Sequence, residues 1–408
     1  MKILLVTQYF WPENFRINDL IKELRKKKIS LTVLTNNPTY PNKIIYSDFY
    51  KNKKKYRKFY KSKIIRFANF SRSNNSAMLL LNYIWFVLMA TIVAILHLRK
   101  IKFDLVFVYA PSPITVAIPA IIFSKIKKIP LVLWVLDLWP ETLKGVGVVN
   151  SRFLLNAIAK IVSIIYKNCA FILGQSRSFV LDIKKFCKRE DFSKIIYFPN
   201  WAENIFSNRK KNKNKKNYFN ILFAGNIGEA QDFNSIVKTA EKLKNDIKIN
   251  WTILGDGRKI DWLKKTVKQK KIDNIFKILG RYPLKKMPYF YNRADALLVS
   301  LKDNEVFEKT IPGKLQSYLL YGKPILGMLN GEGNKIIKNS KSGYVVKAGD
   351  FNSLAKNIIK LKNLSDKKRK NMGENGKKYA LKEFKKNNLI NKLIKIFNLA
   401  INNNEKKK

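Results

Sequence analysis

The stretch LVLWVLD at residues 131–137 decides how the first half of the chain is interpreted. Six apolar residues in an unbroken run are typical of a strand covered on both faces, as in a parallel sheet. Similar runs recur along the first half, and the segments between them, such as 18–28 and 153–167, have helical spacing. We therefore predict a doubly wound α/β sheet with strands at 2–7, 31–36, 64–68, 105–109, 131–137, 171–175 and 195–199.

The basic stretch SNRKKNKNKKN at residues 207–217 interrupts this rhythm. It has no apolar residue to bury, which is typical of a linker. The alternation of strands and helices then resumes, so we expect two Rossmann-like domains facing a cleft. A periplasmic-type binding protein fits this alternation nearly as well. The second set of strands is predicted at 220–224, 250–254, 276–279, 296–300, 324–328 and 343–346. The predicted parts are a first domain over 1–206, a linker over 207–217, a second domain over 218–365 and a helical tail over 366–408.

The composition is that of a large and strongly basic globular protein. With 408 residues, 46% of them hydrophobic, the chain can bury two cores, which excludes disordered and fibrous classes. Lys+Arg is 81 and Asp+Glu is 28, a net charge of +53. That charge invites an RNA-binding interpretation, but heavy use of Lys, Asn and Ile also follows from an AT-rich genome. Two cysteines and the lack of an N-terminal apolar region of signal-peptide length lead us to expect a cytoplasmic protein.

The uncharged stretch AMLLLNYIWFVLMATIVAILHL at residues 77–98 is long enough to cross a bilayer. A single crossing would separate strands of one sheet, so we expect either a buried crossover helix or a helix lying in the membrane interface. The neighbouring segment YKNKKKYRKFYKSK, at 50–63, interleaves bases with aromatic residues. This pattern favours an anionic membrane surface over RNA. We predict peripheral attachment to the inner face of the cell membrane and no nucleic-acid partner.

Three glycine-containing turns follow predicted strands of the second half, at the edge where open α/β sheets bind ligands. The first turn opens a predicted helix, whose N-terminus would let backbone N–H groups approach a diphosphate. The third could present a ring face to a base. These donor-site candidates are Gly225, Asn226 and Gly228 in the first turn, Gly255 in the second, and Gly280, Arg281 and Tyr282 in the third.

A lysine opens another predicted helix, in the stretch EVFEKTIPGKLQSYLLYGKPILGM at 305–328. Lys314 stands where a helix N-terminus already favours anions. We expect it to contact a phosphate oxygen. A solvated lysine at a helix start is the simpler alternative.

Two carboxylates stand just after the strand at 131–137. Asp137 and Glu141 are candidates for a general base or for binding a hydroxyl, and both could instead cap the next helix. His97, in the apolar stretch, is treated as structural. Without a Cys/His cluster or a paired-aspartate motif, we predict no metal site.

Together these motifs resemble the bacterial glycosyltransferase family 4, in particular its branch of N-acetyl-L-fucosamine transferases of O-antigen and colanic-acid assembly. The resemblance implies a GT-B fold, a UDP-sugar held mainly by the second domain, and retention of configuration without a metal or other cofactor. The matching pieces are TQYFWPE (7–13), DLWPE (137–141), GNIGEAQDF (225–233), GRYPLKKMPYFYNRADALLVSLKD (280–303), IPGKLQSYLLYGKPIL (311–326) and GYVVKAGD (343–350).

The donor residues of the family are only partly matched. The Arg and Lys that many members use after the glycine turn are absent from 229–233, so Lys314, Arg281 or a helix N-terminus must neutralise the diphosphate. The two glutamates that contact the donor in the family, eight positions apart, correspond either to Lys309 and Ser317 or, one register earlier, to Glu308 and Gln316. Which of these pairs faces the donor is open.

On the acceptor side, Asp137 falls where relatives place a His or Asp beside the reacting hydroxyl, and Glu13 and Glu141 lie in the matching motifs. We therefore expect a retaining glycosyltransferase that moves an N-acetylated amino sugar from a UDP-sugar to a polyprenyl-diphosphate-linked acceptor in surface polysaccharide synthesis, such as O-antigen or capsule. The alternatives are a GT-B nucleotide-sugar 2-epimerase, which would need more acidic and histidine groups, and a basic RNA-binding protein, which leaves 77–98 unexplained.

Overall fold

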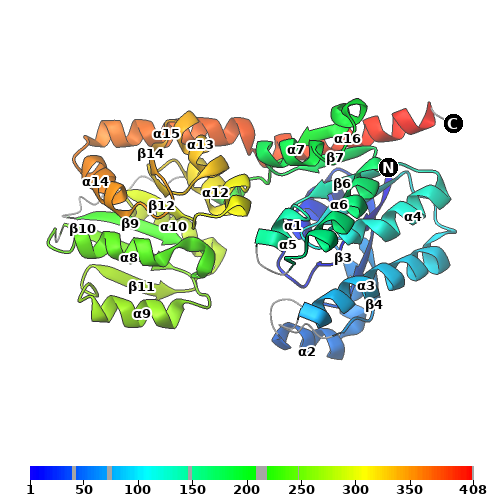
Figure 1. Cartoon of the computed structure of the whole chain (residues 1–408), viewed down its shortest axis with the longest axis horizontal. Coiled ribbons are helices and arrows are strands. Elements are labelled where there is room, and N and C mark those ends of the chain that lie inside the picture. The colour runs from blue at the N-terminus through cyan, green and yellow to red at the C-terminus, as the bar shows by residue number, and fades with distance from the viewer. Residues whose placement is uncertain (39–42, 71–75, 146–148, 208–217, 247, 407–408) are drawn as a thin grey trace. The chain divides into compact units, whose positions relative to one another are not determined.

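The computed structural model describes the whole chain except residues 39–42, 71–75, 146–148, 208–217, 247 and 407–408 (Figure 1). The described chain divides into two compact units. The first contains Met1–Phe198 together with Leu389–Lys408, and the second contains Pro199–Asn388. Each unit is built on one mostly parallel sheet with helices on its faces, so the predicted fold class is confirmed.

The first unit has an eight-stranded sheet in the order β3-β4-β2-β1-β5-β6-β7-β8. All neighbours pair in parallel except β3, which is antiparallel to β4. Every strand predicted for the first half is present. The two-residue β3 was not predicted because it is too short to show a period. The strands are β1 (Lys2–Val6), β2 (Ser30–Asn36), β3 (Lys58–Phe59), β4 (Ser62–Phe67), β5 (Leu105–Ala110), β6 (Leu131–Val135), β7 (Phe171–Gly174) and β8 (Ile195–Tyr197).

Helices cover both faces of this sheet. Alternate strand residues such as Val108 point to one face, where they share a core with Phe86 and Phe123 from the helices α3 and α4. On the opposite face, Phe107 meets Phe397 at 5.1 Å between ring centroids. One face therefore carries α3 (Ser76–Val93) with its π-helical end η2 (Ala94–Leu98), α4 (Ala117–Lys127), α6 (Arg152–Lys167) and α7 (Arg177–Lys184), and the other carries α1 (Arg16–Lys26) and α16 (Lys386–Glu405).

The second unit has a six-stranded, fully parallel sheet in the order β11-β10-β9-β12-β13-β14. Each strand predicted for the second half is present. The strands are β9 (Phe219–Ala224), β10 (Ile249–Leu254), β11 (Phe276–Gly280), β12 (Ala296–Ser300), β13 (Ile325–Met328) and β14 (Gly343–Val346). The helices are α8 (Phe233–Lys242), α9 (Ile260–Gln269), α10 (Met287–Arg293), α11 (Glu305–Lys309), α12 (Gly313–Tyr321), α13 (Gly331–Asn339), α14 (Phe351–Lys362) and α15 (Asp366–Glu383).

The boundaries between the units differ from the predicted ones. Residues 199–206, expected in the first domain, belong to the second unit, because the Phe206 ring stacks on Tyr291 at 4.9 Å. The tail is helical, as predicted, but it is shared: α15 packs on α12 in the second unit, and α16 returns to the first unit from Leu389 onward. The predicted linker lies outside the described residues except for Ser207.

The apolar stretch at 77–98 forms α3 and η2, and it is buried on one side only. Phe86, Ala90 and Leu98 lie in the core, whereas Ile84 and Leu88 are exposed. Within the described residues, Met78–Leu98 is the one helix long and apolar enough to cross a membrane by length and composition. Because its inner side packs on the sheet, this helix matches neither a fully buried helix nor a membrane-spanning one.

The basic segment at 50–63 packs on Trp11 and on α1. Its rings Tyr56 and Phe59 are buried and pack on Trp11, at 4.8 and 5.0 Å between centroids. Arg25 of α1 donates a hydrogen bond to the carbonyl of Tyr60, at 3.2 Å. The segment therefore packs on the α1 side of the sheet, and part of the aromatic pattern that suggested a membrane contact is local core.

Candidate functional site

The three predicted glycine turns meet at the carboxyl edge of the second sheet. The N–H of Gly225 donates to the carbonyl of Leu254 at 2.9 Å, and the N–H of Gly255 donates to the carbonyl of Gly280 at 2.8 Å. Gly255 has φ +139°, and a Cβ there would lie 1.8 Å from the carbonyl oxygen of Gly225. Only glycine allows this approach. The result is a platform of bare backbone at the ends of β9, β10 and β11.

Lys314 reaches this platform from the first turn of α12. Its Nζ lies 3.7 Å from the centroid of the Phe223 ring, and a Cβ on Gly225 would lie 3.0 Å from the same Nζ. The Nζ is buried and has no hydrogen-bond partner. Burial lowers the pKa of Lys314 to about 7. An ammonium buried without a counter-ion is costly, so an anion bound beside Gly225 would supply the partner that it lacks.

The helix that favours an anion here is α12, because the helix expected directly after the first glycine turn does not begin there. A 3-10 turn (Glu229–Gln231) separates Gly228 from α8, and the Asp232 side chain caps α8 by accepting from the N–H of Ser235 at 3.4 Å. A carboxylate already occupies that helix N-terminus. The N-terminus of α12, at Pro312, has no side-chain cap. The N–H of Leu315 donates to the carbonyl of Pro312 at 2.9 Å, and the N–H groups of Gly313 and Lys314 before it can meet an anion.

Two lysines that the sequence did not point to stand beside the first turn. Lys259 and Lys302 each lie 2.7 Å from a carboxylate oxygen of Glu229. Their hydrogen bonds lower the pKa of Glu229 to about 2. Their main chains are held there, with the N–H of Lys259 donating to Ile227 at 3.0 Å and that of Lys302 to Ala230 at 2.9 Å. Two bases thus stand beside 229–233, contributed by segments that follow β10 and β12.

Of the two register pairs, only Glu308 carries a carboxylate. Glu308 accepts from the Nδ2 of Asn330 at 3.2 Å. Gln316 is 1% exposed and donates to the carbonyl of Asn200 at 2.8 Å. Ser317 donates to the Oε2 of Glu203 at 2.6 Å.

Glu203 therefore brings a carboxylate to Ser317 of α12. It comes from the 199–206 segment, and the sequence pattern assigned that segment to the other domain. Lys309 ends α11 and is half-buried.

The remaining donor candidates lie around the platform. Asn226 is exposed, and its side chain lies against Gly228, where a Cβ would come within 2.5 Å of its Nδ2. Arg281 is exposed just beyond Gly280. The Tyr282 ring packs edge-on against Phe290 at 4.7 Å.

In the first unit, Asp137 lies just beyond the carboxyl end of β6. It accepts hydrogen bonds from the Thr142 hydroxyl at 2.5 Å and from the Trp139 indole at 3.3 Å, and the Ser112 side chain is a third partner. Burial raises the pKa of Asp137 despite these hydrogen bonds. Glu141 begins the short helix α5 (Glu141–Gly145) and is half-buried. Asp137 is thus held by these side chains and by the backbone N–H of Leu138.

Glu13 does not fit the acceptor role expected of it. It is 1% exposed, and its Oε2 accepts from the N–H of Phe10 at 3.1 Å. The buried Arg66 guanidinium has its pKa lowered to about 10 by burial, an effect that the nearby Glu13 charge opposes. Glu13 therefore stabilises its own loop. His97 is exposed in η2, and within the described ranges no group of three His, Cys, Asp or Glu side chains could hold a metal ion.

Comparisons with known proteins agree with this geometry. Residues 204–379 match the family model "Glycosyl transferases group 1". No curated protein sequence matches. Among solved structures, the chain is similar to HepE from Anabaena in complex with UDP and glucose (TM-score 0.67, 13% identity, covering 97% of this chain and 98% of that one). It is also similar to sucrose-phosphate synthase from Thermosynechococcus elongatus (0.73, 10%, 98% and 98%).

A third similar structure is that of a TarM mutant from S. aureus with fondaparinux, α-GlcNAc-glycerol and UDP (TM-score 0.65, 11% identity, covering 97% of this chain and 99% of that one). At such low sequence identities, the similarity shows that the folds are alike and says nothing of the reaction. Residues 204–379 of the second unit thus match the glycosyl transferases group 1 model, and the chain has the GT-B fold of two Rossmann-like units.

Proposed function

We propose that this protein is a retaining glycosyltransferase that moves a sugar from a UDP-sugar to a polyprenyl-diphosphate-linked acceptor. The sugar is an N-acetylated amino sugar, and the product belongs to a surface polysaccharide such as O-antigen or capsule. The observation that carries the proposal is Lys314, a buried ammonium without a partner beside three glycine turns. It lies inside the part of the chain that matches the group 1 family.

The nucleotide is proposed to lie over the platform. Its diphosphate pairs with Lys314 and the uncapped start of α12, and Lys302 and Lys259 add positive charge nearby. Glu203, held by Ser317, accepts hydrogen bonds from the ribose hydroxyls. HepE and TarM support UDP as the nucleotide, since both were solved with it.

In the proposed reaction, the bond between the sugar C1 and the diphosphate oxygen breaks, and the acceptor oxygen bonds to C1 on the same face. The proton of the acceptor hydroxyl passes to the leaving diphosphate. Lys314 and the α12 N–H groups stabilise the negative charge that develops there, the kind of preorganised stabilisation that dominates many enzymes. Asp137 orients the hydroxyl, and the lysines take the place of a metal ion.

The lipid-linked acceptor implies a location. We propose that the enzyme works at the inner face of the cell membrane as a peripheral protein.

The test is a screen of purified protein against UDP-sugars, with released sugar and UDP detected by mass spectrometry. We expect slow hydrolysis of one or a few UDP-N-acetylamino sugars by the wild type and none by Lys314→Met. If no UDP-sugar is turned over and UDP does not bind, the protein does not use this donor class and the proposal fails.

A further inference from the structure

Three neighbouring helices of the first unit expose apolar side chains on their outer side. Figure 1 shows α3, α4 and α6 in blue to green, and α4 contacts both of the others. All three bury their inner side in the same core. The side turned away from the sheet, here called the apolar face, consists of Leu80, Leu81, Ile84, Leu88, Ile92 and Leu96 of α3 and η2, Ile122 and Ile126 of α4, and Phe153, Leu154, Ile161 and Ile164 of α6.

The exposure of these side chains is high. Leu96 is 69% exposed and Phe153 is 81% exposed. On α3 and η2 most of them recur every four residues from Leu80 to Leu96, which places them along one side of the helix. Single exposed apolar residues are common in soluble proteins, but a large contiguous set marks a surface that meets a protein or a membrane.

The charges around the apolar face point to the partner. The helices α3, α4 and α6 and the segment η2 contain no Asp or Glu. Helices that follow parallel strands run antiparallel to them, so the three C-termini lie together at the amino ends of the strands. Basic side chains gather there, and Lys127 donates to the carbonyl of Arg99 at 2.8 Å, which links two of these ends.

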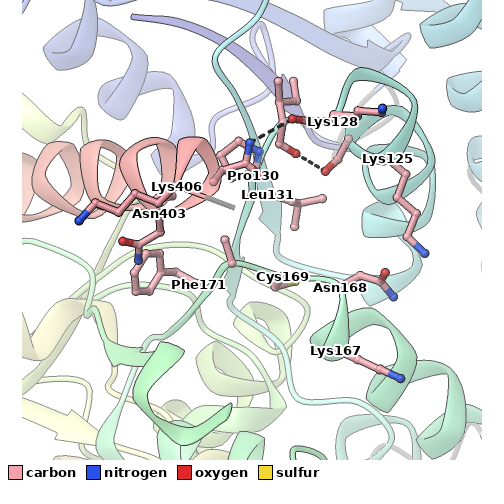
Figure 2. A pocket seen from close by; sticks show the side chains of 15 residues that line it. Lys125, Lys128, Pro130, Leu131, Lys167, Asn168, Cys169, Phe171, Asn403 and Lys406 are labelled. Carbon is pink, nitrogen blue, oxygen red and sulfur yellow. Dashed lines mark hydrogen bonds between the residues drawn. The ribbon is translucent and has the colours of Figure 1, made fainter. Parts of the chain in front are cut away.

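A basic groove lies at this same edge. Figure 2 shows it beside the starts of β6 and β7, with Lys125, Lys128, Lys167 and Lys406 around it. Its volume is about 570 Å³. The Asn404 side chain bridges to the carbonyl of Lys128 at 3.0 Å, which ties α16 to the wall of the groove. The apolar face is thus bordered by cations and has no acid of its own.

We infer that the apolar face lies on an anionic lipid bilayer, with α3, α4 and α6 parallel to the membrane plane and the basic groove among the lipid phosphates. This inference rests on the proposed function, because it supplies the surface by which that enzyme meets a lipid-linked acceptor. An interfacial helix buries its apolar side at the boundary of headgroups and acyl chains while its cations pair with anionic lipids. The segment at 50–63, on the α1 side, is not part of this contact.

A second copy of the chain is the competing occupant. The cations along the edge favour the bilayer, because in a contact between copies they add like charges without an acid in the three helices to pair with them.

The experiment measures binding of the full-length protein to vesicles by flotation, using phosphatidylcholine alone or with phosphatidylglycerol. We expect the wild type to float with the anionic vesicles. Phe153→Ser with Ile164→Ser should lower the partition coefficient at least about tenfold. Lys125→Gln with Lys167→Gln should lower it roughly twentyfold, since each base near an anionic surface contributes about fivefold.

Matched controls come from the same unit. Leu399→Ser alters an exposed leucine on α16, and the triple change of Lys53, Lys54 and Lys55 to Glu alters the 50–63 segment. The Leu399→Ser variant should float like the wild type, because Leu399 is not part of the apolar face. Loss of flotation with the triple change alone would move the contact to the α1 side.

Three outcomes overturn the inference. They are unchanged flotation of the variant that carries Phe153→Ser and Ile164→Ser, flotation that is equal on neutral and anionic vesicles and insensitive to the lysine changes, and a lipid-free dimer that Phe153→Ser with Ile164→Ser dissociates. UDP affinity, measured by calorimetry on the same variants, should stay unchanged. If UDP does not bind even to the wild type, the enzyme assignment fails while the membrane contact can still be judged from flotation.

Discussion

Changing Lys314 to Met tests the donor site, because UDP binding next to this lysine should take up a proton. Burial lowers the pKa of this lysine from 10.5 to about 7, so at pH 8 about one molecule in ten carries the charge. A diphosphate beside the Nζ favours the charged form and raises that pKa again. Binding of UDP at pH 8 should therefore take up close to 0.9 proton, a value that follows from an unbound pKa of about 7 and a bound pKa near its usual range.

The assay is titration calorimetry of UDP at pH 8 in two buffers with different ionisation enthalpies, repeated at pH 7 and 9. Wild-type affinity should fall up to about tenfold per pH unit above 7, because the lysine must be protonated to bind. UDP itself is at least about nine-tenths ionised in this range, since the second phosphate pKa is about 6. Lys314→Met should bind about tenfold to a hundredfold more weakly at pH 7 and show no proton uptake.

Lys335→Met, which alters an exposed lysine on α13, is the control and should behave as wild type. The apo protein gives a second readout. Since the folded pKa of Lys314 lies below the unfolded one, wild-type stability should rise with pH between about 7 and 10.5, and the rise should be smaller in Lys314→Met. Wild-type UDP binding without proton uptake and with an affinity that does not change between pH 7 and 9 would show that Lys314 does not meet the diphosphate.

Three further changes test other parts of the site. Asp137→Asn should lower sugar transfer by about 10²–10⁴-fold while calorimetry finds UDP affinity unchanged; transfer within a few-fold of wild type would remove Asp137 from the reaction. Glu203→Gln should weaken UDP about tenfold but leave binding of UDP lacking the ribose hydroxyls unchanged, and an equal loss for both ligands would refute the ribose contact. Gly255→Ala should lower the free energy of unfolding by at least about 1–3 kcal/mol and the melting temperature by several degrees, because its Cβ would lie 1.8 Å from the Gly225 oxygen. Gly349→Ala, at φ +78° with open space around it, is its control, and equal melting temperatures for the two variants would contradict the close approach.

The amino-acid sequence determined the strands, the two α/β units and the backbone part of the candidate site. The unbroken apolar run at 131–136 and the polar–apolar alternation at 250–253 are each visible within a few residues, so strands could be located without knowing their neighbours. Gly225 and Gly255 could be located for the same reason, because a turn that needs glycine is a local property. Lys314 was also found locally, since a lysine after Pro-Gly marks a helix start.

Only the tertiary structure decided which side chains complete the site. Glu203 reaches Ser317 from a segment that the pattern assigned to the other domain, and Lys259 and Lys302 meet Glu229 from two different strands. Glu13, by contrast, proved to be buried inside its own loop. Such pairings join residues far apart in the chain, and local spacing carries no information about them.

The tertiary structure also decided what covers the apolar stretch at 77–98. Its composition is apolar all round, so no period distinguishes an inner from an outer side. Packing on the sheet buries Phe86 and Ala90 and leaves Ile84 and Leu88 exposed. The sequence determines that this helix is apolar, but only the position of the sheet determines which of its sides remains exposed, because burial is a property of neighbours and not of the residue itself.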